Sequence, residues 1–409
     1  MDRKELIDNF SHNPLKGVRP RPGSLFTFVT TRSRFGTGKS LPPKPSPASV
    51  SRSGRSDAPL RLRSALRKKW CLRDSTALFC NSNNRVFVHK RLEIQPLSAD
   101  APTEFWRKTF ACAEPLKIWY NDEREASMAK CDVCFRQCEI GEGKTGFCGA
   151  RICVDGRVIA GNYARVTSAA LDPIEKKPLK MFRPGKKVLS VGSYGCNLRC
   201  PFCQNNDISW GEQVKLYATG AEEWLPEEIV AKALELKAVG NIGVAFTYNE
   251  PLVGYEFVRD TAKLAKESGM ENVLVSNGTA SERVFEEISP YIDAMNIDLK
   301  SFTGGFYRNL IGGDFEMTKR FIERAVETCH VELTTLIIPG ENDSEEEMRE
   351  LSSWVAALEA RVGKAIPLHV TRFFPQFKMT DRGPTPVETV YRLADVAREK
   401  LAHVFAGNV

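Results

Sequence analysis

Short apolar runs alternate with longer amphipathic stretches from about residue 186 to the C-terminus. Val, Ile and Leu dominate these runs, and near-continuous apolar strands are typical of parallel sheets with helices on their faces. Six runs therefore predict β-strands: KVLSVG ending at Gly192, IGVAFT at 242–247, NVLVS at 272–276, AMNIDLK at 294–300, VELTTLIIP at 331–339 and IPLHVTRF at 366–373.

The intervening stretches predict amphipathic helices. LPEEIVAKALELKAVG (225–240) has Pro226 in its first turn and Gly240 at its end. DSEEEMRELSSWVAAL (343–358) places acidic residues in the first turn, where the helix dipole favours them. TPVETVYRLADVAREKL (385–401) has Thr385 as its expected cap and Glu388 three residues later, which predicts a capping box.

Alternating strands and helices imply parallel pairing through right-handed crossovers. The region is shorter than the roughly 250 residues of an eightfold barrel. We therefore predict an α/β fold, a partial, open, TIM-like (βα)6 barrel over residues 181–409. Its functional site should lie at the carboxyl ends of the strands. A Cys-rich segment at 101–180 and a basic arm at 1–100 precede the barrel.

Charge separates the arm from the rest of the chain. Residues 1–100 carry 20 Lys/Arg against 7 Asp/Glu, which leaves 38 basic and 44 acidic residues elsewhere. The arm is rich in Ser and Pro, so we predict disorder, with either a transit-peptide role or a start codon placed too far upstream. Because the body is mildly acidic, nucleic-acid binding is not expected. No apolar run reaches about 18 residues, so no membrane span is predicted either.

Cysteines are concentrated in one part of the chain. Eight of the twelve lie between residues 131 and 203 at short spacings. This clustering fits metal ligation in a reducing compartment better than a secreted disulfide framework. We therefore expect a cytoplasmic protein.

Three cysteines fall in one loop directly after the first predicted strand. The spacing is Cys196-x3-Cys200-x2-Cys203, within SYGCNLRCPFCQNN. A [4Fe-4S] cluster takes one ligand per iron, so three thiolates leave one iron open to an outside ligand. An open position distinguishes a catalytic metal site from a closed structural one. The alternatives are a zinc knuckle completed by a remote residue, or buried reduced cysteines.

CNLRCPFC resembles the cluster motif of the radical S-adenosylmethionine (SAM) enzymes. Further motifs in the same order, including DPIEKKPLKMF, TYNEP, NIDLK, LIIPGENDS and IPLHVTRFFP, resemble the radical enzyme of the AmmeMemoRadiSam system, a group similar to pyruvate formate-lyase activating enzymes. The resemblance implies a [4Fe-4S] cluster whose open iron binds SAM. It also implies reductive cleavage of SAM to methionine and a 5′-deoxyadenosyl radical, which abstracts hydrogen from a substrate.

The resemblance also assigns roles to residues around the loop. Phe202 matches the aromatic residue that packs near the adenine of SAM. TYNEP stands where related activating enzymes have Gly-Gly-Glu-Pro, so Asn249 and Glu250 take the position that holds the methionine amino group. In VSNG, Val275 replaces an aspartate of the activating enzymes, which puts a bound monovalent cation in doubt.

Three more residues are assigned at later strands. Asp298 and Lys300 match residues near the SAM carboxylate, and His369 matches a histidine that contacts the nucleoside. Charge supports part of this independently, because a zwitterionic ligand needs an acceptor such as Glu250 and a donor such as Lys300. The structural alternatives are a surface ion pair for Asp298 and Lys300, a first-turn helix acid for Glu250, and a core histidine for His369.

An earlier group of cysteines has a different pattern, Cys131-x2-Cys134-x3-Cys138-x9-Cys148, with Cys153 just beyond. Four thiols around a Gly-rich turn fit a closed site for zinc or for a second iron–sulfur cluster. Reduced structural cysteines are the alternative. A segment this small has little hydrophobic core and needs a bound metal to be ordered.

Two functional hypotheses follow from these patterns. The first is a radical SAM oxidoreductase that takes hydrogen from a glycine on a partner protein or from a small molecule, with an electron donor such as flavodoxin or ferredoxin. The second is a structural metal-binding or nucleic-acid-binding module without radical chemistry. The second predicts a colourless zinc protein whose binding to polyanions weakens with salt.

Overall fold

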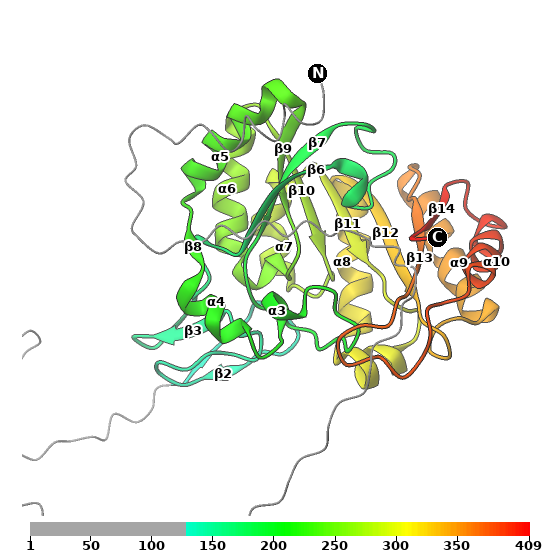
Figure 1. The fold of residues 1–409 in the computed structure, drawn as a ribbon, viewed down its shortest axis with the longest axis horizontal. Coiled ribbons are helices and arrows are strands. Elements are labelled where there is room, and N and C mark those ends of the chain that lie inside the picture. The colour runs from blue at the N-terminus through cyan, green and yellow to red at the C-terminus, as the bar shows by residue number, and fades with distance from the viewer. Residues whose placement is uncertain (1–127) are drawn as a thin grey trace, which may run out of the picture. The chain divides into compact units, whose positions relative to one another are not determined.

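A computed structural model describes residues 128–409 of the chain (Figure 1). The predicted arm at 1–100, and the first part of the predicted Cys-rich segment, lie outside the described residues. None of the helices in the described part is long and apolar enough to cross a membrane.

An eight-stranded sheet forms the centre of the fold, in the order β14-β13-β12-β11-β10-β9-β7-β6. Every neighbouring pair is parallel except β6 and β7, which are antiparallel. Its strands are β6 Ser168–Pro173, β7 Lys187–Gly192, β9 Asn241–Phe246, β10 Glu271–Ser276, β11 Ala294–Asp298, β12 His330–Ile337, β13 Leu368–Arg372 and β14 Val404–Gly407. The α/β class and all six predicted strands are confirmed.

Two strands of this sheet were not predicted. β6, with sequence SAALDP, lies inside the predicted Cys-rich segment, so the sheet begins before residue 181. It is an edge strand with several exposed positions, and its apolar signal is correspondingly weak. β14 has four residues, VFAG, too few to stand out from the end of the preceding helix.

Helices cover the outer face of the sheet, as Figure 1 shows for α5, α6, α8 and α10. The α-helices are α3 Asn206–Ser209, α4 Val214–Gly220, α5 Pro226–Glu235, α6 Tyr255–Glu267, α7 Glu282–Ile288, α8 Phe315–Thr328, α9 Glu345–Val362 and α10 Val387–Arg398. Short 3-10 turns are η1 Ile174–Lys176, η2 Leu236–Val239, η3 Pro251–Gly254 and η4 Ser289–Tyr291, and η5 Phe306–Ile311 is a π-helix.

The predicted capping box of the last helix is wrong. Pro386, not Thr385, is the residue that precedes α10, and no side chain caps this end. The Thr385 hydroxyl instead donates to the carbonyl of Ile337 at 2.6 Å and accepts the Phe373 N–H at 3.3 Å. A buried hydroxyl with partners on two strand ends is not available to the helix.

The segment after β6 crosses the interior of the barrel. Ile174 and Leu179 are fully buried against inward-facing strand residues such as Val188 and Ala294. Glu332 on β12, which is also fully buried, accepts the backbone N–H groups of residues 180 and 181, both at 2.8 Å. These contacts close the barrel toward the amino ends of β11 and β12, so the opposite edge carries the open site.

The first described residues form small hairpins beside the carboxyl ends of the strands. Their strands are β1 Ala129–Lys130, β2 Glu139–Ile140, β3 Arg151–Val154, β4 Arg157–Ala160, and β5 Arg165–Val166 paired with β8 Glu222–Glu223. Arg151 forms a 2.6 Å ion pair with Glu256 of α6. Ser281 donates its backbone N–H to Val133 at 2.9 Å. The hairpins are thereby fastened to the barrel at the edge expected to hold the functional site.

Candidate functional site

The three-cysteine loop follows β7 at the carboxyl edge of the sheet. Gly195 has a φ of +96°, and a Cβ there would lie 2.8 Å from both the Ala150 Cβ and the Cys148 carbonyl oxygen. Only glycine fits this conformation and this close approach. Next to it, the Cys196 N–H donates to the Cys148 carbonyl at 3.1 Å. The loop is therefore fixed against the earlier cysteine segment.

All three loop thiols are held in a poorly solvated environment. Burial raises the pKa of Cys196 well above its usual range and that of Cys200 to about 12, and it also raises the pKa of Cys203. Leu198 donates its N–H to the Cys196 sulfur at 3.4 Å. Because free thiols with raised pKa values stay protonated at neutral pH, it takes a metal to convert them to thiolates.

The three cysteines of the loop supply the ligand type that an iron–sulfur cluster takes. In a four-iron cluster each thiolate binds a different iron, so the ligands need not converge on one point. Three cysteines on one loop match that requirement and leave one iron without a protein ligand from the loop.

Glu250 lies in the loop after β9 and is buried, with 4% of its surface exposed. Its carboxylate accepts hydrogen bonds from Leu252 N at 3.1 Å, from Ser276 Oγ at 2.8 Å and from Asn277 N at 2.8 Å. Burial raises the pKa of Glu250 to about 7, although the three donors partly oppose the shift. The predicted first-turn acid does cap η3, yet it is also a deeply buried carboxylate beside the cluster loop.

Asn249 holds the backbone of the cluster loop. Its Oδ1 accepts the Ser193 N–H at 3.0 Å and its Nδ2 donates to the Gly195 carbonyl at 3.0 Å. Glycine, which related activating enzymes have at this position, could not make either bond. The side chain of Asn249 therefore adds a bidentate link between the end of β9 and the loop, a role that its sequence position did not reveal.

Asp298 and Lys300 form an ion pair at the end of β11, with Nζ and Oδ2 2.8 Å apart. The Asp298 side chain is 32% exposed and that of Lys300 is 16% exposed. The pair is therefore partly buried, unlike the surface ion pair that was the structural alternative. Burial opposes the charged form of Lys300, but the Asp298 carboxylate outweighs it and raises the pKa of the ammonium. After burial, the charge of Lys300 is the largest influence on the pKa of Cys200, which places the pair beside the cluster loop.

The remaining two predicted contacts lie in different surroundings. Phe202 is buried in an apolar cluster with Phe306, Tyr307 and Phe373. His369 is the second residue of β13, and its Nε2 lies 2.7 Å from the Glu332 carboxylate. The arrangement of His369 matches the core-histidine alternative, and its contact with a nucleoside stays a prediction.

Two asparagines that were not predicted connect the site. Asn277, in the VSNG motif after β10, donates to Asn197 Oδ1 at 2.9 Å and lies 3.9 Å from the Cys196 sulfur. Asn197 in turn donates to Thr279 Oγ1 at 2.8 Å. Asn277 could have been selected from the sequence because it belongs to the VSNG motif. The spacing of the cysteine loop gives no reason to select Asn197.

The chain is similar in sequence to radical SAM proteins. A model of the radical SAM superfamily matches residues 190–352. The uncharacterized protein MJ0808 of Methanocaldococcus jannaschii is 37% identical over 299 residues, covering 71% of this chain and 84% of that protein. The pyruvate formate-lyase-activating enzyme of Clostridium pasteurianum is 30% identical over 164 residues, 39% of this chain and 65% of that enzyme.

Among solved structures, a domain of the pyruvate-formate lyase-activating enzyme from Bacteroides vulgatus aligns with 40% of this chain and 98% of its own, at 19% identity and a TM-score of 0.35. The family match covers the cysteine loop, Asn249, Glu250, Asp298 and Lys300. The extended similarity to the archaeal protein covers most of both chains. The chain belongs to the radical SAM superfamily.

Proposed function

We propose that this protein is an activating-enzyme-like radical SAM oxidoreductase, the radical enzyme of an AmmeMemoRadiSam system, and that its hydrogen donor is a glycine on a partner protein. The observation that carries the radical chemistry is the meeting of three groups at one edge of the sheet. These are the three-cysteine loop, the buried Glu250 network and the Asp298–Lys300 pair.

Each group has a distinct part in this proposal. Cys196, Cys200 and Cys203 would hold the cluster, and Asn249 keeps the backbone of their loop in place. Glu250 would accept the ammonium of SAM, and Lys300 would donate to its carboxylate. A cluster held by these cysteines would supply the one-electron reduction of SAM, which would release methionine.

The identity of the hydrogen donor rests on similarity alone. Pyruvate formate-lyase-activating enzymes are among the similar proteins, at 28–30% identity. Their match to less than half of this chain supports a protein glycine as the donor, and a small-molecule donor is the alternative. A low-potential electron donor such as flavodoxin or ferredoxin, and a cytoplasmic location, complete the proposal.

The first experiment measures 5′-deoxyadenosine formed by anaerobically reconstituted protein with SAM and dithionite. We expect product from the wild type, none from Cys203→Ala and near-normal product from Cys329→Ala. Cys329 is a matched control because its thiol donates to the Ala325 carbonyl at the end of α8, in a different part of the fold. A full cluster that neither cleaves SAM nor changes its spectrum on SAM addition would contradict the proposal.

A second experiment identifies the class of hydrogen donor. Cell extract labelled with deuterated glycine is dialysed, and the protein fraction and the small-molecule fraction are incubated separately with active enzyme. Deuterium in 5′-deoxyadenosine from the protein fraction is the expected result. Deuterium from the dialysable fraction alone would replace the protein glycine with a small-molecule donor.

A further inference from the structure

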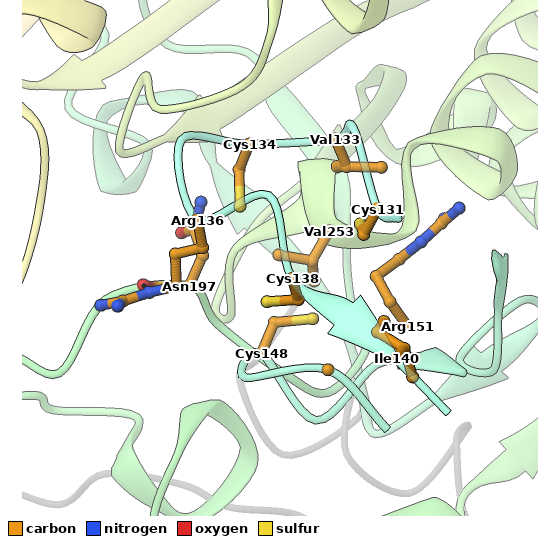
Figure 2. Close-up of a pocket in the computed structure, with 11 residues that line it drawn as sticks. Cys131, Val133, Cys134, Arg136, Cys138, Ile140, Cys148, Arg151, Asn197 and Val253 are labelled. Atoms are coloured by element: carbon orange, nitrogen blue, oxygen red, sulfur yellow. Dashed lines mark hydrogen bonds between the residues drawn. The ribbon is translucent and has the colours of Figure 1, made fainter. Parts of the chain in front are cut away.

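A second group of cysteines surrounds a small cavity beside the cluster loop. Cys131, Cys134, Cys138 and Cys148 all line it, together with Asn197 and Val253 from the barrel (Figure 2). Figure 2 shows the sulfur of Cys134 directed toward those of Cys138 and Cys148. Three of the four are buried, with 5% to 9% of their surface exposed. Four thiols gathered around one enclosed space are a donor set for a soft metal.

A buried cation without a full set of partners also lines the cavity. Arg151 is 4% exposed and pairs with Glu256, yet its Nε has no hydrogen-bond partner. A buried unpaired N–H costs free energy, and an anionic centre close by would reduce that cost. Arg151 and Cys131 line the same cavity.

Cys153 does not belong to this group, although it lies only five residues beyond Cys148. Its sulfur lies 3.7 Å from the Glu142 carboxylate, and it does not line the cavity. A thiolate beside a carboxylate is disfavoured by like-charge repulsion. Cys153 is therefore a buried cysteine of the same segment that serves as a matched control.

The cavity lies directly behind the cluster loop. Asn197, between the first two cluster cysteines, lines the same cavity as Cys134. Its carbonyl accepts the Nε–H of Arg136 at 2.8 Å. The backbone carbonyl of Cys148 accepts the Cys196 N–H at 3.1 Å. Whatever fixes the four cysteines therefore also fixes the back of the cluster loop.

We propose that Cys131, Cys134, Cys138 and Cys148 together ligate a closed, four-thiolate metal centre that braces the cluster loop. Zinc and an iron–sulfur cluster share this ligand chemistry. As the side chains stand, no three lie at single-ion spacing, so binding requires either that the thiols rotate inward or that the centre contains several metal atoms. The thiol protons leave to solvent as the metal binds.

The test is metal content of the full-length chain, which does not depend on activity. Cys196, Cys200 and Cys203 are all replaced by Ala to remove the radical cluster, and zinc, iron and acid-labile sulfide are measured after anaerobic purification. We expect about one metal centre per chain to remain. Zinc without sulfide identifies a single ion, and iron with sulfide identifies a second cluster.

Replacing Cys134 and Cys148 by Ala as well should abolish this residual metal, whereas adding Cys153→Ala should leave it unchanged. The thermal unfolding temperature of each variant shows whether it folds. If the Cys134/Cys148 variant does not fold, cobalt added to the triple variant supplies a second measurement, since thiolate ligation gives intense sulfur-to-cobalt absorption. A folded triple variant with neither residual metal nor these bands would overturn the proposal.

The bracing role has its own measurement. In a chain with an intact radical loop, Cys134→Ala/Cys148→Ala should lose iron from the radical cluster several times faster under a chelator than Cys153→Ala does. Equal rates would overturn the bracing role. Failure of SAM cleavage would leave both results unaffected, because neither measurement uses SAM.

Discussion

Glu250 combines deep burial with three hydrogen-bond donors and a pKa of about 7. Burial makes ionisation of this carboxyl group unfavourable, and a cationic ligand nearby would stabilise the ionised form. We predict that Glu250→Gln weakens SAM binding at least about tenfold, because the amide cannot offer a negative charge to the ammonium. Titration of the cluster spectrum with SAM measures the effect, and the exposed Glu286→Gln is the control.

The same carboxyl group predicts a pH dependence. Its pKa is raised from 4.5 to about 7, so the neutral form stabilises the SAM-free protein fully below pH 4.5, and this contribution is lost as pH rises through about 7. SAM binding requires the charged form, and we expect affinity to increase between pH 6 and pH 8. Glu250→Gln should remove this dependence. An unchanged pH profile in the variant would assign the titration to another group.

The sequence predicted site residues well where chemistry and strand position coincide. Glu250 follows one predicted strand, Lys300 ends another, and both carry charges that a zwitterion needs, so they could be selected before any geometry was known. Asn197 and Asn277 could not, because their importance comes from a hydrogen bond between two loops 80 residues apart. For His369 the position in a strand was misleading. It did not reveal that the imidazole ring is hydrogen-bonded to Glu332.

Among the secondary elements, β12 carries a fully buried carboxylate, Glu332. Glu332 has no exposed surface and accepts hydrogen bonds from His330, His369 and three backbone N–H groups. Burial alone would raise its pKa, but the hydrogen bonds from the histidines and the backbone lower it to about 2. The carboxylate therefore contributes stability above pH 4.5 that is lost as pH falls through about 2.

We predict that Glu332→Gln lowers the free energy of unfolding by about 2–4 kcal/mol at neutral pH, because an amide cannot accept all five bonds. Chemical denaturation measures the change. Glu346, whose side chain is 81% exposed, provides the control variant Glu346→Gln, expected within about 0.5 kcal/mol of wild type. Equal stability of the two variants would show that the segment crossing the barrel is held by its apolar contacts.

The contact between β9 and β10 leaves no room for a side chain at Gly243. A Cβ there would lie 1.6 Å from the Glu271 carbonyl oxygen, which is a backbone atom of the paired strand. We predict that Gly243→Ala destabilises the protein by about 3 kcal/mol or more, since the two strands must separate. Gly305→Ala, where nothing lies within 4 Å of the added Cβ, should be nearly neutral. Thermal unfolding of both variants decides the matter.

Among the secondary elements, the sequence predicted the strands that have strong apolar runs and missed the strands that lack such runs. β7, β9, β10, β11, β12 and β13 are buried on both faces, so hydrophobicity alone located them. β6 has exposed positions and pairs through an antiparallel hairpin, which its composition does not indicate. The predicted capping box of α10 is wrong for a similar reason. The Thr385 hydroxyl forms a tertiary hydrogen bond to Ile337 that the local sequence does not indicate.

For the whole molecule, sequence similarity gives the family and the structure gives the location of the site. The family match and the archaeal relative establish the superfamily, and the sheet establishes where its site lies. The basic arm predicted at 1–100 lies outside the described residues and stays a prediction. Within residues 128–409, the cysteine-rich hairpins and the barrel share their polar contacts, including the 2.6 Å pair between Arg151 and Glu256.

The cavity of the four earlier cysteines has a consequence for how the protein matures. All four are synthesised before the barrel, but Asn197 and Val253, which complete the cavity wall, are synthesised later. A nascent chain that ends before β7 therefore lacks part of the enclosure. For the proposed four-thiolate centre, the complete enclosure therefore forms only after the first strands of the barrel have been synthesised.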